Sequence, residues 1–331
     1  MSVVYLSVRG DPNAGGPSVF CHKFARGLVK LGHKVIYDSP NKANFALCII
    51  ESGKVLRSVD RSKTKVAVRL DGAYFEEYNK LFKRTIRPDM VALHNAIKRD
   101  VEKVDLMIYQ SQFSKDLIDA EIAKRSEGFV VIGNGADTNN FKPTPRLDDG
   151  FVNLLHVGKM RDQYLMESLV GVYSELRARN KKIRLILVGN MDSSCSQVYN
   201  RNKADPNIKY LGPFSNDKLV QAYAHGDVYL GPRMGSSSDN VIAEAQACGL
   251  PVLIPSWSGN CELVADKQSG IIVQSGHWDY GIEYNKNLAN GVEEIMKDLG
   301  GFKKRARKYA VESLSLELMI SKYLKALENL R

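Results

Sequence analysis

Short apolar, β-branched runs alternate along the chain with stretches in which apolar residues recur every three or four positions. The first pattern predicts strands and the second predicts amphipathic helices. In the first half, the expected strands are Val3–Val8, Lys34–Asp38, Phe45–Ile50, Lys65–Leu70, Asp105–Gln110 and Phe129–Ile132. In the second half they are Val152–Val157, Arg184–Val188, Ile208–Leu211, Val228–Leu230, Pro251–Ile254 and Gly270–Val273. Nearly continuous apolar strands between helices predict an α/β fold with parallel sheets covered on both faces.

A polar, proline-containing segment, Asp137–Gly150, separates the two series of strands. It predicts a linker between two Rossmann-like domains, residues 1–145 and 146–312, and 331 residues suit two domains of ~100–200 residues each. The last stretch, residues 313–331, has the spacing of an amphipathic helix. Its apolar positions are Leu316, Met319, Ile320, Tyr323, Leu324 and Leu327.

The formal net charge of +10 lies mostly in the first half, where residues 1–146 hold 24 Lys/Arg and 16 Asp/Glu. This excess favours an acidic partner, such as anionic lipid, a charged glycan or nucleic acid, although a basic surface that only aids solubility fits equally well. No apolar run approaches the ~18 residues that span a bilayer. The first residues resemble a strand more than a signal peptide, so we expect a cytoplasmic protein, or one peripheral on the inner membrane face.

Metal and disulfide chemistry find little support in the residue pattern. The five cysteines are scattered and form no C-x-x-C pair, which predicts buried free thiols. There is no Asp-x-Asp motif, and Asp148-Asp149 falls in the expected linker. We therefore expect no metal site and no bound cofactor.

The loop after the first expected strand, Gly10–Ser18, contains Gly15 and Gly16 directly before a helix. Gly16 is the expected N-cap and Pro17 the first helical residue. The apolar face of this helix should hold Phe20, Phe24, Leu28 and Leu31. Glycines before a helix N-terminus let the backbone approach an anion, although a plain tight turn has the same residues.

Two further loops combine strand ends with polar or basic residues. Lys159 and Arg161 follow the strand Val152–Val157, where they can meet a diphosphate, or form a solvated loop. After Gly231 a small polar loop leads to Asp239 or Asn240, the expected cap of a helix that ends near Cys248. Glu244 lies about one turn inside that helix, where a carboxylate can accept hydrogen bonds from a sugar diol or simply face solvent.

In this order, these segments resemble retaining GT-B glycosyltransferases of family 4. The similar segments are Gly15-Gly16-Pro-Ser with Leu31-Gly-His-Lys-Val35, Ser111–Lys115, Ile132–Pro143, Asn207–Gly212, Gly226–Pro232, Glu244–Val252, Ser258–Glu262 and Ser269–Val273. The resemblance implies two Rossmann-like domains whose parallel sheets face a central cleft. It also implies that the first domain holds the acceptor, the second holds the donor, and the last helix crosses back to the first domain.

The resemblance assigns roles by position. Lys159 takes the place of the family's phosphate-binding arginine, and Glu244 takes the place of the ribose-binding second Glu of its E-x7-E element. Backbone N–H groups near Asp239, Asn240 and Val241 would hold the diphosphate, which Gly15 and Gly16 would approach from the first domain. Gly212 is the last residue of the similar segment Asn207–Gly212, and the resemblance places it among the donor-binding residues.

Three positions depart from the family pattern. Ser236 stands where the first Glu of E-x7-E is usual, and Tyr164, followed by Leu165, stands where a phosphate-binding lysine is usual; Arg161 can replace that charge. Asp71 stands at the position of the family's acceptor-side histidine, where it can orient the acceptor or bind a donor hydroxyl. His94 fits an ordinary helix histidine better than a replacement.

The sequence thus predicts a metal-independent hexosyl- or pentosyltransferase that moves a sugar from a UDP- or GDP-linked donor to a hydroxyl of a glycan or lipid-linked glycan. Lys159, Arg161, Glu244 and Asp71 would form its catalytic group. An acidic or membrane-associated acceptor would bind the basic first domain. The alternatives are a transferase acting on hydroxymethylated DNA bases, a non-catalytic nucleotide-sugar or glycan-binding protein, and a sugar-nucleotide epimerase.

Overall fold

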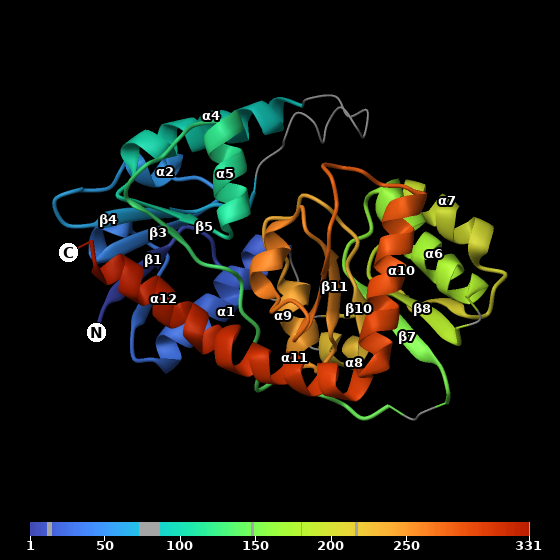
Figure 1. Cartoon of the computed structure of the whole chain (residues 1–331). Coiled ribbons are helices and arrows are strands. Elements are labelled where there is room, and N and C mark those ends of the chain that lie inside the picture. Colours follow the sequence, from blue (N-terminus) through green and yellow to red (C-terminus); the bar gives the residue numbers. More distant parts are fainter. Residues whose placement is uncertain (12–14, 73–86, 147–148, 180, 216–217, 331) are drawn as a thin grey trace. The chain divides into compact units, whose positions relative to one another are not determined.

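The computed structural model describes residues 1–11, 15–72, 87–146, 149–179, 181–215 and 218–330. The chain forms two compact units, each built around its own sheet (Figure 1). Unit 1 consists of Met1–Asn134 and Leu316–Arg331, and unit 2 consists of Gly135–Ser315. Both are α/β, as the alternation of strands and helices predicts.

The change from unit 1 to unit 2 lies at Asn134, before the proline-containing segment that the sequence suggests as the linker. Residues 135–142 already belong to unit 2, and hydrogen bonds join them to its last helix and the residue after it. Ala136 N donates to Leu314 O over 2.9 Å, and Arg307 donates to Thr138 O over 3.0 Å and to Phe141 O over 2.8 Å. These hydrogen bonds are long-range in sequence, which is why local composition does not reveal the boundary.

Unit 1 contains a six-stranded parallel sheet with the order β2-β1-β3-β4-β5-β6. Its strands are β1 (Val3–Leu6), β2 (Lys34–Ile36), β3 (Phe45–Ile49), β4 (Lys65–Arg69), β5 (Leu106–Tyr109) and β6 (Phe129–Val131). Its helices are α1 (Gly16–Lys30), α2 (Gly53–Leu56), α4 (Pro88–Lys103), α5 (Gln112–Glu121) and α12 (Leu316–Glu328). All six strands of the first half lie within two residues of their expected bounds.

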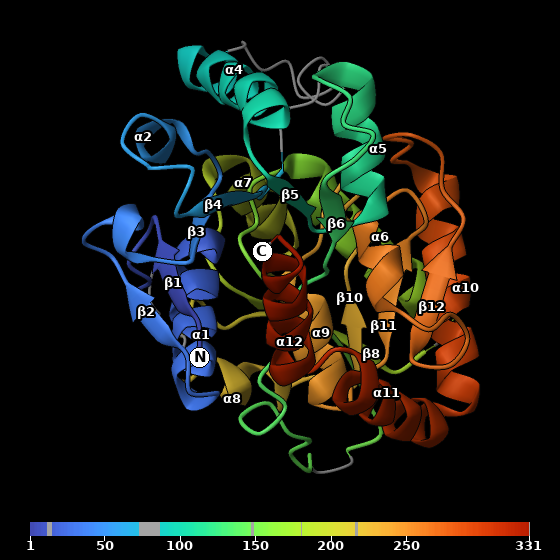
Figure 2. The same cartoon turned by 90° about the vertical axis from the view of Figure 1, so that its left-hand side faces the viewer.

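Helices cover both faces of the unit 1 sheet (Figures 1 and 2). Helices α1 and α12 share one core with β1 and β3, while α2, α4 and α5 pack on the other face. The ring of Tyr323 in α12 lies 5.1 Å from that of Phe24 in α1. All six apolar positions expected in the last helix are buried, so the spacing correctly predicted the buried face of α12.

The start and the buried face of α1 differ in detail from the prediction. Gly15 is the N-cap, so Pro17 is the second helical residue and not the first. Leu31 is 50% exposed, and Cys21 takes its place on the buried face. The physical reason is that the helix ends at Lys30, so Leu31 no longer follows the helical repeat.

Unit 2 has a second six-stranded parallel sheet with the order β12-β11-β10-β7-β8-β9. Its strands are β7 (Val152–Val157), β8 (Ile183–Val188), β9 (Ile208–Tyr210), β10 (Val228–Leu230), β11 (Val252–Pro255) and β12 (Gly270–Val273). Its helices are α6 (Gln163–Ala178), α7 (Ser193–Asn202), α8 (Leu219–Tyr223), α9 (Asn240–Ala247), α10 (Ile282–Lys297) and α11 (Leu299–Ser313). One face packs against α6, α7 and α10, and the other against α8 and α9.

No helix in the described ranges combines the length and the apolar character needed to cross a membrane.

Candidate donor and acceptor sites

The strand order of unit 2 reverses between β7 and β10, which are neighbours in the sheet although five helices and strands separate them in the sequence. In open parallel sheets, ligands bind beside the carboxyl ends of the two strands at which the order reverses. In unit 2 those ends lead into Gly158-Lys159 and into Gly231-Pro232. The topology therefore selects the two loops that the sequence analysis singled out for anion binding.

The β7 loop carries the expected cations on a tightly packed backbone. Gly158 N donates to Val188 O over 3.0 Å, and a Cβ on Gly189 would lie only 1.9 Å from Gly158 O. Gly189 also has a φ of +125°, which L side chains rarely adopt, so both conformation and space require glycine there. The side chains of Lys159 and Arg161 are exposed, as an anion-binding role requires.

The N-terminus of α9 lies at the same edge of the sheet, and an asparagine holds it. Asp239 N donates to Asn260 Oδ1 over 2.7 Å, and Asn260 Nδ2 donates to Asp239 Oδ2 over 2.9 Å. Asp239 is the N-cap residue, as expected, but its side chain does not cap the helix. The carboxylate is turned to Asn260 instead, which leaves the first turn of α9, with Asn240 and Val241, without a side-chain cap. Such a turn can donate to an anion.

Glu244 is buried in α9, with only 3% of the residue exposed, so the alternative in which Glu244 faces solvent is wrong. Its Oε2 accepts a hydrogen bond from the hydroxyl of Tyr223 over 2.9 Å. Burial, and then the nearby Glu244 charge, raise the pKa of Tyr223 well above its ordinary value. Tyr223 therefore stays protonated and orients the carboxylate.

His156, at the end of β7, is a residue of this edge that the sequence analysis missed. Its Nδ1 lies 2.9 Å from Leu230 O in the neighbouring strand, so Nδ1 carries the proton. Burial lowers its pKa to about 4, against the opposing effects of the Leu230 carbonyl and Asp239. The ring is thus neutral at pH 7 and ties β7 to β10. The neighbours of His156 in β7 are apolar, so the local sequence pattern did not indicate a functional residue at this position.

The loop after β10 is held by aromatic residues from the segment after β12. Met234 N donates to the hydroxyl of Tyr280 over 2.9 Å, and the hydroxyl of Tyr284 donates to Pro232 O over 2.7 Å. A Cβ on Gly235 would lie 2.2 Å from the ring of Trp278, and Gly235 has a φ of +70°. We call Trp278, Tyr280 and Tyr284 the aromatic clamp.

Two of the departures from the family pattern are Tyr164, in the first turn of α6, and Ser236, in the loop after β10. The rings of Tyr164 and Tyr280 stack with centroids 5.6 Å apart and an interplanar angle of 15°. Ser236 is buried, and its carbonyl oxygen accepts from Gly259 N over 2.7 Å. The tyrosine thus supports the clamp where a lysine would supply charge. Ser236 contributes its backbone to the loop.

In unit 1, Asp71 lies just beyond β4 within a polar network. It forms an ion pair with the buried Arg69, and Gln110 Nε2 donates to its Oδ1 over 3.2 Å. Asn134 completes the network by donating to Gln110 Oε1 over 2.8 Å and accepting from Arg69 over 3.1 Å. Arg69 and Gln110 therefore contact Asp71 directly, Asn134 holds both of these side chains, and 17% of the Asp71 side chain is exposed. His94 lies in α4 and is half-buried.

The expected glycines lie in open positions. A Cβ on Gly15, Gly16 or Gly212 would meet no atom within 4 Å. Gly212 has a φ of +74° and accepts from Gly189 N over 3.0 Å, so its conformation and not its surroundings favours glycine. Residues 12–14 of the first glycine loop, and Asp148, lie outside the described residues.

The cysteines are free thiols, and four of them are buried as predicted, whereas Cys261 is half-buried. Burial raises the pKa of Cys21 and Cys261 to about 11 and that of Cys195 and Cys248 to about 12. Among the described residues, no three His, Cys, Asp or Glu side chains are grouped so as to hold a metal ion.

Comparison with known proteins agrees with this fold. Residues 152–298, most of unit 2, match the family described as "Glycosyl transferases group 1". The match shows that unit 2 is similar to glycosyl transferases of group 1, and the two six-stranded parallel sheets are those of the GT-B fold.

Curated relatives of this type match parts of the chain. The chain is 26% identical over 218 residues to the D-inositol 3-phosphate glycosyltransferase of Corynebacterium aurimucosum, covering 60% of the chain and 50% of that protein. It is 22% identical over 224 residues to the GDP-mannose-dependent alpha-mannosyltransferase of Mycobacterium tuberculosis, covering 65% and 50%. It is 24% identical over 137 residues to the phosphatidylinositol N-acetylglucosaminyltransferase gpi3 subunit of Schizosaccharomyces pombe, covering 40% and 30%. The chain thus matches half of these relatives' length or less.

Solved structures share the fold over the whole chain. Sucrose-phosphate synthase from Thermosynechococcus elongatus superposes with a TM-score of 0.77 and 16% identity, covering 99% of this chain and 98% of the other. HepE from Anabaena, in complex with UDP and glucose, superposes with a TM-score of 0.73 and 17% identity, covering 99% of each chain.

Proposed function

We propose that this protein is a retaining glycosyltransferase that moves a sugar from a nucleoside-diphosphate sugar to a hydroxyl of a glycan or lipid-linked glycan. The observation that carries the proposal lies in unit 2, at the edge of the sheet where the strand order reverses. Lys159, Arg161 and the first turn of α9, which has no side-chain cap, all lie there, within the segment that matches the group 1 family. The HepE structure, which contains UDP and glucose, supports a nucleotide-sugar donor.

In the proposed mechanism, fixed positive groups neutralise the charge that develops on the departing diphosphate. Lys159 and Arg161 supply full charges, and the N–H groups of Asn240 and Val241 supply the helix dipole. Glu244, oriented by Tyr223, binds the ribose of the donor. The acceptor hydroxyl attacks from the face of the leaving group, and its proton passes to the leaving phosphate, so the anomeric configuration is retained.

Unit 1 would hold the acceptor. The Arg69–Gln110–Asn134 network fixes Asp71 in one orientation, from which it can accept a hydrogen bond from an acceptor or donor hydroxyl. The basic excess of residues 1–146 suits an acidic or membrane-associated acceptor. On this proposal the protein works in the cytoplasm or at the inner face of a membrane, without a metal or cofactor.

The test begins with thermal unfolding in the presence of UDP- and GDP-linked sugars, because a bound donor raises the midpoint by mass action. The stabilising donor is then incubated with candidate glycans and lipid-linked glycans, and release of nucleoside diphosphate is measured with and without chelator. We expect acceptor-dependent release that survives chelation. Donor binding without release from any acceptor would instead establish a non-catalytic binding protein, and loss of release that Mg²⁺ restores would refute the metal-independent mechanism.

A further inference from the structure

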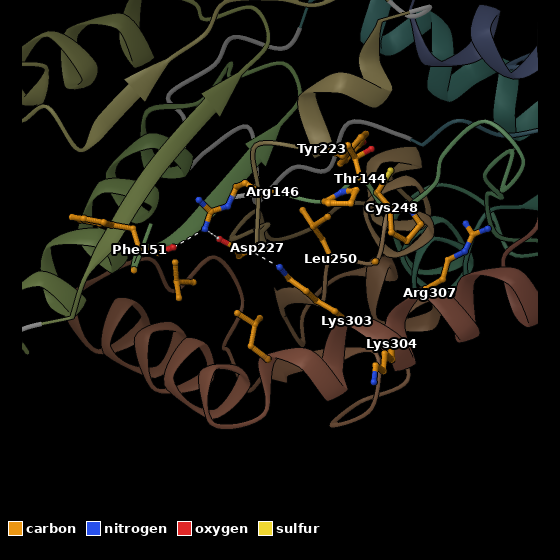
Figure 3. Close-up of a pocket in the computed structure, with 17 residues that line it drawn as sticks. Thr144, Arg146, Phe151, Tyr223, Asp227, Cys248, Leu250, Lys303, Lys304 and Arg307 are labelled. Carbon is orange, nitrogen blue, oxygen red and sulfur yellow. Dashed lines mark hydrogen bonds and ion pairs between the residues drawn. The ribbon is translucent and has the colours of Figure 1, made fainter. Parts of the chain in front are cut away.

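Unit 2 contains a cavity of about 880 Å³ at the edge of the sheet opposite the proposed donor site (Figure 3). Its wall includes Phe151 and Val152 at the start of β7 and Gly226-Asp227 just before β10. Since all strands of this sheet run in the same direction, their starts lie at one edge and the donor loops at the other. The cavity therefore lies at the edge opposite the donor loops, and Tyr223, whose hydroxyl binds Glu244, is the residue of its wall that also contacts the proposed site.

Most of the cavity wall is apolar. The apolar side chains come from the segment before β7, from the turn after α9 and from the start of α11; they are Pro143, Pro145, Phe151, Val152, Leu250 and Leu299. The volume falls within the ~300–1,000 Å³ of typical small-molecule sites, which combine apolar walls with a few polar groups. The site thus suits a ligand with an apolar body.

The charged groups of the wall are basic except for one acid. They are Arg146, Lys303, Lys304, Arg307 and Asp227, which gives a formal charge of +3. Arg146 Nη2 lies 2.7 Å and Lys303 Nζ lies 2.6 Å from the Asp227 carboxylate, reaching it from two sides (Figure 3). The single acid is thereby neutralised by two of the cations.

Arg307 and Lys304 carry the remaining positive charge of the wall. Arg307 donates to the carbonyl oxygens of Phe141 and Ala247 over 2.8 and 2.7 Å, and carbonyls leave its charge uncompensated. Lys304 is exposed beside it on α11. In that helix, five of the six residues 303–308 are Lys or Arg. Asp149, outside the wall, is engaged by Arg146 and Arg184.

We propose that this cavity binds an anionic amphiphile, an apolar chain that ends in a phosphate. The chain would lie against Phe151, Leu250 and Leu299, and the phosphate would meet the α11 cations. Inorganic phosphate lacks the apolar contact, and a cationic amphiphile is repelled by the net charge. The site is independent of sugar transfer, so it stands or falls separately from the proposed function.

The test is isothermal titration calorimetry of the full chain with decyl phosphate below its micelle concentration, beside inorganic phosphate and decyltrimethylammonium. Thr144, an exposed residue of the wall, offers a matched pair of variants. Thr144→Trp places a large ring in the cavity without touching the core, and Thr144→Ser leaves the space open. Lys304→Gln removes one charge from the exposed face of α11.

We expect decyl phosphate to bind at least tenfold more tightly than either comparison compound. Thr144→Trp should weaken that binding at least tenfold, Lys304→Gln several-fold, and Thr144→Ser not at all. No measurable binding, equal binding to Thr144→Trp, or equal binding of the cationic amphiphile would overturn the proposal. Nucleotide-sugar binding, measured on the same variants, should stay unchanged.

Two sources of the same chemistry are separated by a second measurement. Co-sedimentation with vesicles of phosphatidylcholine containing one fifth phosphatidic acid, blocked by Thr144→Trp, would assign the cavity to a membrane lipid. Binding of decyl phosphate without such co-sedimentation would assign it to a soluble anionic amphiphile.

Discussion

His156 shows how one side chain can link the candidate site to the stability of unit 2. A histidine in an apolar strand carries no sequence signal, yet the structure buries its ring and directs Nδ1 to Leu230 O. Glu244 is the converse case, because the family resemblance marked the residue while only the fold showed its burial and its hydrogen bond to Tyr223. At this scale, sequence supplies candidate residues and packing decides their protonation and orientation.

The depressed pKa of His156 predicts a loss of stability on acidification. The folded value of about 4 lies below the ordinary 6.5, so the unfolded chain takes up a proton first as the pH falls. The stability is full above pH 6.5 and is lost between pH 6.5 and 4, by up to about 3 kcal/mol at 1.36 kcal/mol per pH unit. Urea unfolding followed by tryptophan fluorescence reports on unit 2, since Trp257 and Trp278 both belong to it.

The control for this prediction is His156→Gln, which cannot titrate. The difference in unfolding free energy between the wild type and this variant should shrink as the pH falls from 7 to 4. A difference that stays constant over this range would show that the fold does not lower the pKa of His156.

Lys159 offers the sharpest test of the diphosphate contact. Removing one group that stabilises developing charge costs about 100-fold in turnover. We expect Lys159→Ala to reduce nucleoside-diphosphate release by about this factor while the thermal midpoint stays within about a degree, because the side chain is exposed. Lys209→Ala, an exposed lysine in β9, is the control. Equal turnover in both variants would remove Lys159 from the mechanism.

At the scale of elements, hydrophobic periodicity predicted the twelve strands and the last helix because each of these buries a regular apolar face. It did not reveal the aromatic clamp, whose members lie in an irregular segment and the start of α10. Trp278 has a φ of +52°, a conformation that a non-glycine residue rarely adopts, and it packs on Gly235. Contacts between two loops far apart in sequence leave no periodic trace.

We expect a change in the aromatic clamp to affect sugar transfer and not the affinity for the free nucleoside diphosphate. Tyr280→Phe removes the acceptor for Met234 N, which should lower stability by about 1 kcal/mol. Loosening the loop should reduce sugar transfer about tenfold, while affinity for the free nucleoside diphosphate stays the same. Tyr173→Phe, which loses its hydrogen bond to Asp205 away from this loop, is the matched control. If both variants lose the same activity, the effect is one of stability alone.

At the scale of the whole molecule, the chain forms two units, and the first is closed by residues from the opposite end of the sequence. Leu316–Glu328 packs on α1 through Phe20, Phe24 and Tyr323. Unit 1 therefore depends on a segment that is synthesised only after unit 2.

Removal of residues 316–331 should accordingly destabilise unit 1 and spare unit 2. The truncation exposes the apolar face of α1, at a cost of about 2–3 kcal/mol for each large side chain uncovered. Hydrogen exchange should rise in β1 and β3, while the tryptophan-detected transition of unit 2 keeps its midpoint. Protection of β1 that survives truncation would show that unit 1 folds without α12.

The sequence by itself determined the α/β class, the strands and the last helix, and it singled out the loops proposed to bind an anion, because these features depend on local periodicity, helix capping and glycine. It also suggested the family through eight ordered segments. Only the tertiary structure decided where unit 1 ends, what Glu244 and Asp71 contact, how His156 is protonated, and that a basic, apolar cavity lies at the far edge of unit 2. Those properties arise from contacts between residues distant in the chain, which local pattern does not encode.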